Sequence, residues 1–454
     1  MSRHVIIGRL GAKDTISVPT GNGEVATKLQ FVQAKARLDH GIGRALDDLA
    51  KLNLYPTEMG VDLMVLAAHV HAADTRLSRD TESQDNWTRE IRLVVPVSNI
   101  GRWRSTTKVL RRMLNFLTGD RWSIDFRGRP PGFETTVGPR PLQLVGTPFD
   151  DLSLFSGGLD SLIGAIDGLE GGRTPLFISH AGEGSVSAAQ ETLFRQLQAH
   201  YPKRSFNRLR IWMNFPDGFV KNVSSEKSTR GRSFLFFAAG IFAATGLGKN
   251  YSLRVPENGL IALNVPLDPL RLGALSTRTT HPFYIARWNE LLGILGISVT
   301  IENPYWDKTK GEMVASCANQ PLLKRLIPDA MSCSSPTKGR WTGHGTEHCG
   351  FCLPCIIRRA AIRSGLGNDP TAYTLSDLKA RALDTKQAEG QQVRSFQFAI
   401  DRLRKNPRLA SLLIHKPGPL GDESSVQQTA LAGVYSRGME EVGALLANVR
   451  TTSN

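Results

Sequence analysis

Apolar residues in the middle of the chain fall into short runs that alternate with longer amphipathic stretches. The short runs have the length of buried strands, and the stretches between and after them have helical periodicity. Strands are expected at 152–155, 175–179 and 209–213, and helices at 162–169, 188–199 and 233–245. Because strands that alternate with helices build parallel sheets through right-handed crossovers, this region predicts an α/β fold with helices on both faces of a parallel sheet.

The segment before this region has a different pattern of apolar and polar residues. It contains short apolar runs such as 5–7, a helical stretch at 62–73 and an alternating, strand-like run at 90–97. These elements predict an α+β domain over residues 1–146. Proline and glycine crowd 130–146, as they do in a linker.

The end of the chain is polar and amphipathic. Its periodicity predicts helices at 375–383, 393–403 and 431–449. We therefore expect three parts: an N-terminal α+β domain for recognition of a partner or substrate, a central α/β domain and a helical C-terminal extension. Their expected bounds are 1–146, 147–375 and 376–454.

The sequence contains no candidate membrane span or export signal. The longest apolar stretch, 234–248, includes three glycines and is shorter than the roughly 20 residues that cross a bilayer. The apolar run near the N-terminus ends at Arg9, which is too early for a signal-peptide core. We expect a cytoplasmic protein that does not bind a membrane.

The net charge is strongly positive. The sequence has 56 Lys and Arg against 41 Asp and Glu, a formal charge of +15. Such an excess attracts polyanions, so nucleic acid or an acidic protein is a possible partner. A generally basic, solvated surface explains the charge equally well.

A glycine turn joins the first expected strand of the central region to the helix that follows. The residues are Ser156, Gly157, Gly158, Leu159, Asp160 and Ser161. Two glycines let the backbone approach a phosphate, and the free amides and hydroxyls at a helix start favour an anion. No Gly-Lys-Ser/Thr occurs, so the loop of kinases and GTPases is absent.

This hexapeptide resembles the SGGxDS loop of the PP-loop ATP pyrophosphatases, which cleave ATP to AMP and pyrophosphate and adenylate a substrate. The resemblance implies that Ser156, Gly157, Gly158 and Ser161 hold pyrophosphate and that Asp160 acts near Mg²⁺. It also places His180, at the end of the next strand, beside the adenosine; a capped polar turn is the alternative for His180.

Four of the five cysteines lie in one segment: Cys333, Cys349, Cys352 and Cys355. Four thiolates match a closed structural zinc site. An iron–sulfur cluster uses the same ligands, and His344 or His348 could replace one cysteine. The remaining Cys317 is expected to be a small buried hydrophobe.

The segment 333–373 resembles the zinc motif of QueC, the 7-cyano-7-deazaguanine synthases, through the cysteines and through Gly350, Asp369, Pro370 and Tyr373. Gly231-Arg232-Ser233-Phe234 stands where that family has Gly-Arg-Asn-x-Phe, with serine replacing asparagine. Segment 303–312 resembles the family's strand end and lysine. The likeness covers about 150–375 and implies catalytic roles for Asp160, Arg232 and Lys310; a helix N-cap is the alternative for the last segment.

The flanking segments have no counterpart in QueC, and they resemble the QatC-like proteins, QueC-like members of the Qat antiphage defence system. That likeness includes 62–74, 87–89, 96–97, Trp103 and 116–122, and a middle signature of 257–259, Asn264, Pro266, Leu267 and 276–282. In the signature Arg271, Arg278 and His281 gather cations suited to a carboxylate or phosphate. Glu257 could accept hydrogen bonds from a purine edge. A solvated loop is the alternative.

These observations favour a QueC-like ATP-dependent ligase in antiphage defence, with structural zinc, Mg²⁺ and ATP as co-substrate. It would adenylate a 7-deazaguanine carboxylate and pass the acyl group to an amine on a partner protein. An N-terminal amine suits this role because its pKa, about 8, lies below that of lysine, about 10.4. A nitrile synthase using ammonia, a PP-loop protein that modifies tRNA, and a nucleic-acid-binding module remain open.

Overall fold

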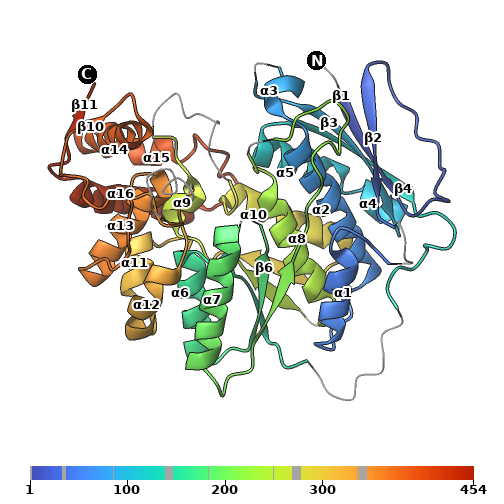
Figure 1. Ribbon diagram of the computed structural model, residues 1–454, viewed down its shortest axis with the longest axis horizontal. Helices are drawn as coiled ribbons and strands as arrows, with labels where there is room; N and C mark the ends of the chain where they lie inside the picture. Colours follow the sequence, from blue (N-terminus) through green and yellow to red (C-terminus); the bar gives the residue numbers. More distant parts are fainter. Residues whose placement is uncertain are drawn as a thin grey trace.

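The computed structural model describes residues 3–32, 37–84, 86–138, 147–182, 184–226, 228–248, 250–267, 278–334, 336 and 345–453. Two parallel sheets with helices packed against them dominate the molecule, and a group of helices lies at the C-terminal side (Figure 1). This mixed α/β architecture agrees with the fold class expected for the central region. No helix in these ranges is both long and apolar enough to span a bilayer.

The central sheet has five parallel strands in the order β7-β6-β5-β8-β9. They are β5 (Asp151–Leu154), β6 (Pro175–His180), β7 (Asn207–Ile211), β8 (Tyr251–Arg254) and β9 (Val299–Glu302). The three strands predicted from the apolar runs are confirmed, with ends shifted by one or two residues. Chain order reverses direction between β5 and β8, and ligands of parallel α/β sheets bind at such a switch point.

Helices cover both faces of this sheet. On one face α6 (Leu159–Glu170) and α7 (Gly184–His200) share a core with Phe177 of β6, whereas α8 (Arg232–Thr245) and α10 (Pro282–Leu295) share the opposite core with Leu176 and Ile178. Neighbouring residues of β6 thus point to opposite faces, as strand geometry requires.

The N-terminal part contains a second sheet of four strands, ordered β2-β1-β3-β4. These are β1 (Arg3–Arg9), β2 (Glu24–Gln30), β3 (Glu90–Val97) and β4 (Arg121–Gly128), and every pairing is parallel. This differs from the α+β organisation expected here, because the strands are all parallel and helices connect β2 to β3 and β3 to β4. The helices are α1 (Ile42–Ala50), α2 (Glu58–Arg76), α3 (Arg79–Glu82), α4 (Ile100–Arg104) and α5 (Thr107–Thr118).

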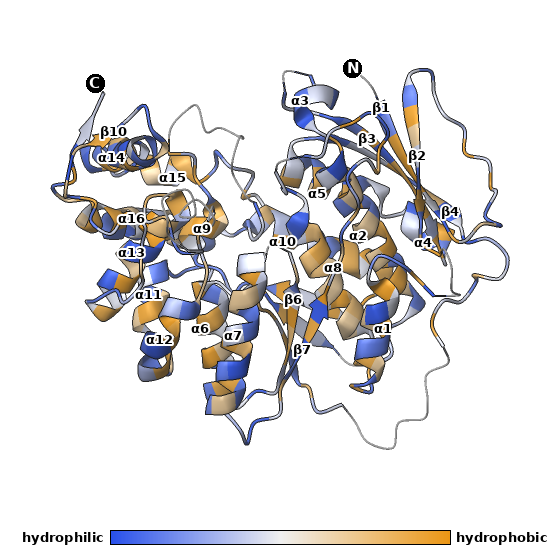
Figure 2. Cartoon of the chain, viewed as in Figure 1, coloured by the Kyte–Doolittle hydropathy of each residue, from blue (hydrophilic) through white to orange (hydrophobic). Residues whose placement is uncertain are grey.

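Helix α2 joins the two sheets into one packed body. Its residues from Gly60 to Thr75 are all buried, and it packs against both α8 and β3. Figure 2 shows α2 and α8 coloured as hydrophobic over most of their length. A helix that is buried on all sides is part of a core. One hydrophobic core therefore runs from the N-terminal sheet to the central sheet and crosses the expected boundary at residue 146.

A second core lies under the C-terminal helices. It joins α9 (Gly259–Leu263) and α13 (Leu353–Leu366) with α14 (Ala388–Lys405), α15 (Leu409–Leu413) and α16 (Ser425–Leu445). The other short elements are α11 (Lys310–Ala315), α12 (Gln320–Leu326), η2 (Ile327–Asp329), β10 (Leu383–Asp384) and β11 (Thr451–Thr452).

The helix predicted at 375–383 is wrong, whereas those predicted at 393–403 and 431–449 lie largely within α14 and α16. Arg359 donates from Nη1 to the Leu375 carbonyl at 2.9 Å, and the Leu375 amide donates to the Cys349 carbonyl at 3.1 Å. The Asp377 carboxylate caps the Lys379 amide at 2.8 Å. These contacts bind the backbone groups that a helix would pair internally.

Candidate functional site

The glycine turn lies between β5 and α6, as the strand–turn–helix pattern predicts. Gly157 has φ +82°, and a Cβ there would lie 3.0 Å from Cγ of Gln190, so a side chain is disfavoured by both conformation and space. The Ser156 and Ser161 hydroxyl oxygens are 3.2 Å apart at the start of α6. The start of this 12-residue helix, where the helix dipole is positive, and the two hydroxyls favour an anion.

A cavity of about 360 Å³ opens in front of this turn, at the carboxyl ends of β5 and β8. The turn, the start of α8, the segment after β8 and the cysteine segment all contribute to its wall. Its polar lining includes Ser156, Ser161, Arg232, Ser233, Glu257, Thr280, Ser332 and Cys333. The position is the one expected for a ligand site, where strand order reverses.

Asp160 and Lys310 form an ion pair next to the cavity. The Lys310 Nζ lies 2.8 Å from Asp160 Oδ1, and both side chains are about nine-tenths buried. The other oxygen, Oδ2, accepts from the Asn258 side chain at 2.7 Å and from its amide at 3.2 Å. Asp160 therefore links Lys310 to the 257–259 turn beside the cavity.

The segment 309–312 combines the two interpretations given to it from sequence. Thr309 caps α11 in a reciprocal capping box with Glu312, which fixes the start of the helix. Lys310, the first residue of α11, reaches Asp160 from there. Thr309 is therefore an N-cap, and the helix that it caps positions Lys310 next to Asp160.

Glu257 is the acidic group of the cavity wall. Burial raises its pKa to about 7, and the nearby Asp160 adds to the rise, whereas the hydroxyl of Thr280 donates to Glu257 and opposes it. A carboxyl group with such a pKa is present in both protonation states near neutral pH. It can accept hydrogen bonds from a ligand when it is ionised.

Arg232 lies in the cavity wall, but His180 does not. His180, at the end of β6, is 4% exposed, and its ring packs edge-on against Phe236 with centroids 5.8 Å apart. Burial, with Arg232 and His71 nearby, lowers the pKa of His180 to about 3, so the ring is neutral. His180 therefore lies behind the wall of this cavity.

Two of the three expected cations of the middle signature, Arg278 and His281, lie close together: the His281 amide donates to the Arg278 carbonyl at 3.4 Å, and both side chains pack against Phe116. His281 is fully buried and acts as N-cap of α10, where its Nδ1 accepts from the Phe283 amide at 3.2 Å. Burial lowers its pKa to about 3, so it carries no charge at neutral pH. Arg278 faces a neighbouring cavity, and Arg271 lies outside the described residues.

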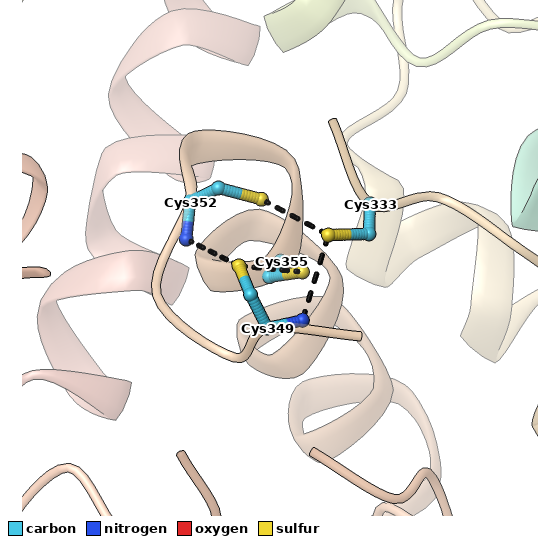
Figure 3. Close-up of side chains that lie close together, drawn as sticks. All are labelled: Cys333, Cys349, Cys352 and Cys355. Carbon is cyan, nitrogen blue, oxygen red and sulfur yellow. Dashed lines mark hydrogen bonds between the residues drawn. The ribbon is translucent and has the colours of Figure 1, made fainter. Parts of the chain in front are cut away.

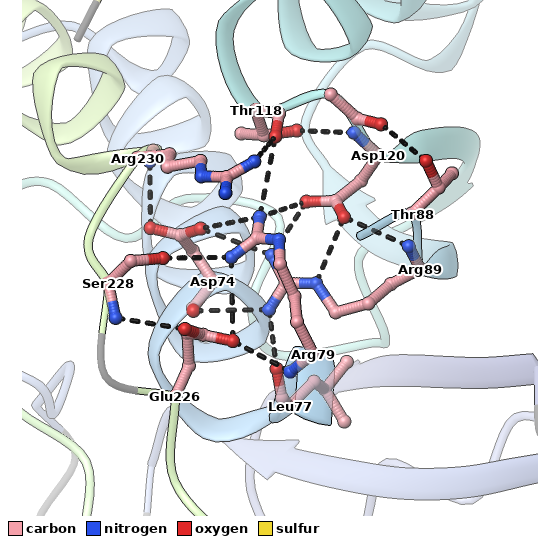
Figure 4. A network of polar contacts seen from close by, with 12 residues as sticks. Asp74, Leu77, Arg79, Thr88, Arg89, Thr118, Asp120, Glu226, Ser228 and Arg230 are labelled. Carbon is pink, nitrogen blue, oxygen red and sulfur yellow. Dashed lines mark hydrogen bonds and ion pairs between the residues drawn. The ribbon is translucent and has the colours of Figure 1, made fainter. Parts of the chain in front are cut away.

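A buried charge network supports the α8 side of the cavity, and sequence patterns gave no role to its members (Figure 4). Arg79 and Arg89 each lie 2.6 Å from Asp120, and Arg89 lies 3.2 Å from Asp74. Asp74 Oδ2 accepts from the Gly231 amide at 2.7 Å, immediately before Arg232. Burial opposes ionisation of Asp120, but Arg89 and Arg79 outweigh it and hold the pKa of Asp120 below its usual value.

The four cysteine sulfurs form a compact, buried group (Figure 3). All four lie within 4.8 Å of one another; the Cys333–Cys352 and Cys349–Cys355 separations are 3.8 and 3.9 Å. Tetrahedral zinc with bonds of about 2.3 Å requires sulfurs about 3.8 Å apart. The spacing therefore fits a single zinc ion; an iron–sulfur cluster would need room for several irons and sulfides between the thiolates.

Local contacts organise this group. The amides of Cys349 and Cys352 donate to the sulfurs of Cys333 and Cys349 at 3.5 and 3.3 Å. Such hydrogen bonds favour thiolates. His348 is not among the grouped ligands: its Nε2 accepts from the Ser332 amide at 3.1 Å, and burial lowers its pKa to about 3. His344, the other alternative ligand, lies outside the described residues.

The cysteine segment also contacts the glycine turn directly. The Met331 amide donates to the Gly157 carbonyl at 2.9 Å, and the Leu159 amide donates to the Ser332 hydroxyl at 3.2 Å. Arg358 Nη1 donates to the same hydroxyl at 3.2 Å. A metal held by Cys333 would therefore fix the chain that carries these contacts.

Searches of protein-family models and of curated proteins found no match to this chain.

Proposed function

We propose that this chain is an ATP-dependent, AMP-forming ligase that adenylates a 7-deazaguanine carboxylate and passes the acyl group to an amine on a partner protein, as the resemblance to QueC-like and QatC-like defence proteins implies. The observation that carries the proposal is the cavity shared by the glycine turn, Arg232 and Glu257. The turn offers donors for pyrophosphate. Glu257 offers an acceptor for the amidine-like edge of the base.

In the proposed reaction a carboxylate oxygen attacks the α-phosphorus, the α–β bridging bond breaks, and pyrophosphate leaves. The acceptor nitrogen then attacks the acyl carbon, loses a proton to solvent, and AMP leaves. The turn at 156–161 stabilises the leaving pyrophosphate, and Arg232 in the cavity wall adds positive charge beside the reacting groups. Mg²⁺, which would accompany ATP, would supply further charge neutralisation.

The first test is the nucleotide product. Wild-type protein with ATP and the carboxylate should release AMP and pyrophosphate, and Asp160→Ala or Ser161→Ala should abolish this release by breaking the ordered turn or its donors. Asp307→Ala, at an exposed aspartate that does not line the cavity, is the control and should retain activity. Release of ADP would contradict the proposed class.

The second test is the acceptor. Intact mass of a co-expressed partner protein should gain a deazaguanine-sized increment with wild type and none with Asp160→Ala. Efficient use of ammonia to give the free nitrile, with no change in partner mass, would replace the ligase with a nitrile synthase.

A further inference from the structure

A second cavity of about 310 Å³ adjoins the first, and Arg230 lines both. Its wall combines residues that are far apart in the sequence: Trp87, Thr118, Arg230, Asn264, Arg278 and Lys416. The proposed reaction does not use this second cavity.

Three cations and no carboxylate are found among the described lining residues. The Arg230 guanidinium lies 4.2 Å from the Trp87 ring centroid and donates to the Thr118 carbonyl at 3.1 Å. Arg278 lies over Phe116 at 4.8 Å and donates to its carbonyl at 2.7 Å. Stacking holds each guanidinium plane, and the Arg278 fork has further N–H groups that can bind a carboxylate. Lys416 is exposed at the rim.

The arginines are held at some electrostatic cost. Burial lowers the pKa of Arg278, and burial together with Arg79 lowers the pKa of Arg230 to about 10. Across the described part of the chain, Arg278 has no salt-bridge partner. Desolvated cations that face a cavity are stabilised when an anionic ligand enters it.

We propose that this second cavity binds an acidic segment of the acceptor protein, one that begins directly after the amine that enters the first cavity. The inference rests on the proposed function, because only an acceptor carried by a polypeptide has a segment to bind. An extended chain advances about 3.3 Å per residue, so the residues next to the amine occupy the neighbouring cavity. Holding them there orients the attacking nitrogen.

The test uses full-length protein and two peptides labelled at the C-terminus, each with a free N-terminal glycine. One peptide has glutamate at positions 2–4, and the other has lysine. Fluorescence polarisation should show the acidic peptide binding about tenfold more tightly, and Lys416→Glu should weaken it about tenfold through charge reversal at the rim. Lys324→Glu, at an exposed lysine of α12 outside both cavities, makes the same change in net charge and should have little effect.

Equal weakening by Lys416→Glu and Lys324→Glu would overturn the inference, because it would reduce the effect to overall charge. Displacement of the acidic peptide by a short single-stranded oligonucleotide at equal concentration would also overturn it, in favour of a phosphate site. Pyrophosphate exchange into ATP, which needs the carboxylate but no acceptor, tests the proposed function separately. Loss of exchange refutes the ligase, whereas the peptide preference tests this cavity alone.

Discussion

Glu257 makes the stability of this protein depend on pH in a direction opposite to that of a salt-bridged acid. Its pKa rises on folding from 4.5 to about 7, so the folded state binds the extra proton. The stabilisation is complete below about pH 4.5 and is lost as pH rises through about 7. We predict that Glu257→Gln removes a pH-dependent contribution on the order of 2 kcal/mol, measured as the change in thermal unfolding midpoint between pH 5 and pH 8.

Glu440→Gln, at an exposed glutamate of α16, is the matched control and should keep the wild-type difference between the two pH values. If Glu257→Gln also keeps the wild-type difference in unfolding midpoint between pH 5 and pH 8, a group other than Glu257 causes that difference.

At the same scale, local motifs were predictable and distant partners were not. The turn at 156–161 and the four cysteines are short patterns whose geometry follows from their spacing. Asp74, Arg89 and Asp120 come from three separate segments, and only folding brings them together. For His281 the local sequence was misleading. Its position near two arginines suggested a cationic binding group, but the side chain is buried and caps α10, and burial keeps it neutral.

At the scale of elements, the cysteine group and the glycine turn are coupled through residues 331–333. We predict one tightly bound zinc per chain and its loss in Cys352→Ser, because thiolate ligation and local folding are linked. Hydrogen exchange should then quicken at the Leu159 amide, which donates to Ser332, and affinity for ATP should fall several-fold. The measurements are metal analysis, exchange mass spectrometry and nucleotide titration.

Cys317→Ser supplies the control, since Cys317 is buried outside the grouped sulfurs and should leave zinc content unchanged. Unaltered protection of the turn in a zinc-free protein would show that the two features are independent.

Hydrophobic periodicity predicted helices and strands well where apolar packing determines the structure. It failed where a specific polar contact determines the structure. The three central strands and the helices near 393–403 and 431–449 follow their apolar patterns. The segment 375–383 has an amphipathic pattern too, but Arg359 and Cys349 bind its first backbone groups and hold it beside the four cysteines. The local sequence pattern does not show that residues distant in sequence bind these backbone groups in place of helical hydrogen bonds.

At the scale of the whole molecule, the division into three sequence segments does not divide the cores. The packing of α2 against α8 places N-terminal residues in the same core as the central sheet. The C-terminal helices similarly complete a core with α9 and α13. The cavity is thus supported by both the N-terminal and the C-terminal segments, and the network that holds Gly231 begins in α2.

We therefore predict that a chain beginning at residue 147 does not fold by itself. Each large apolar side chain of α8 that loses its cover forfeits about 1.5–3 kcal/mol, and a few such losses exceed a typical net stability of about 5–15 kcal/mol. The shortened chain should be insoluble or lack a cooperative thermal transition. Co-expression with a separate chain of residues 1–146 should restore solubility, because the described contacts between α2 and α8 can form without the peptide link. A soluble chain of residues 147–454 that unfolds sharply and forms AMP would contradict this prediction, and the N-terminal segment would then serve recognition alone.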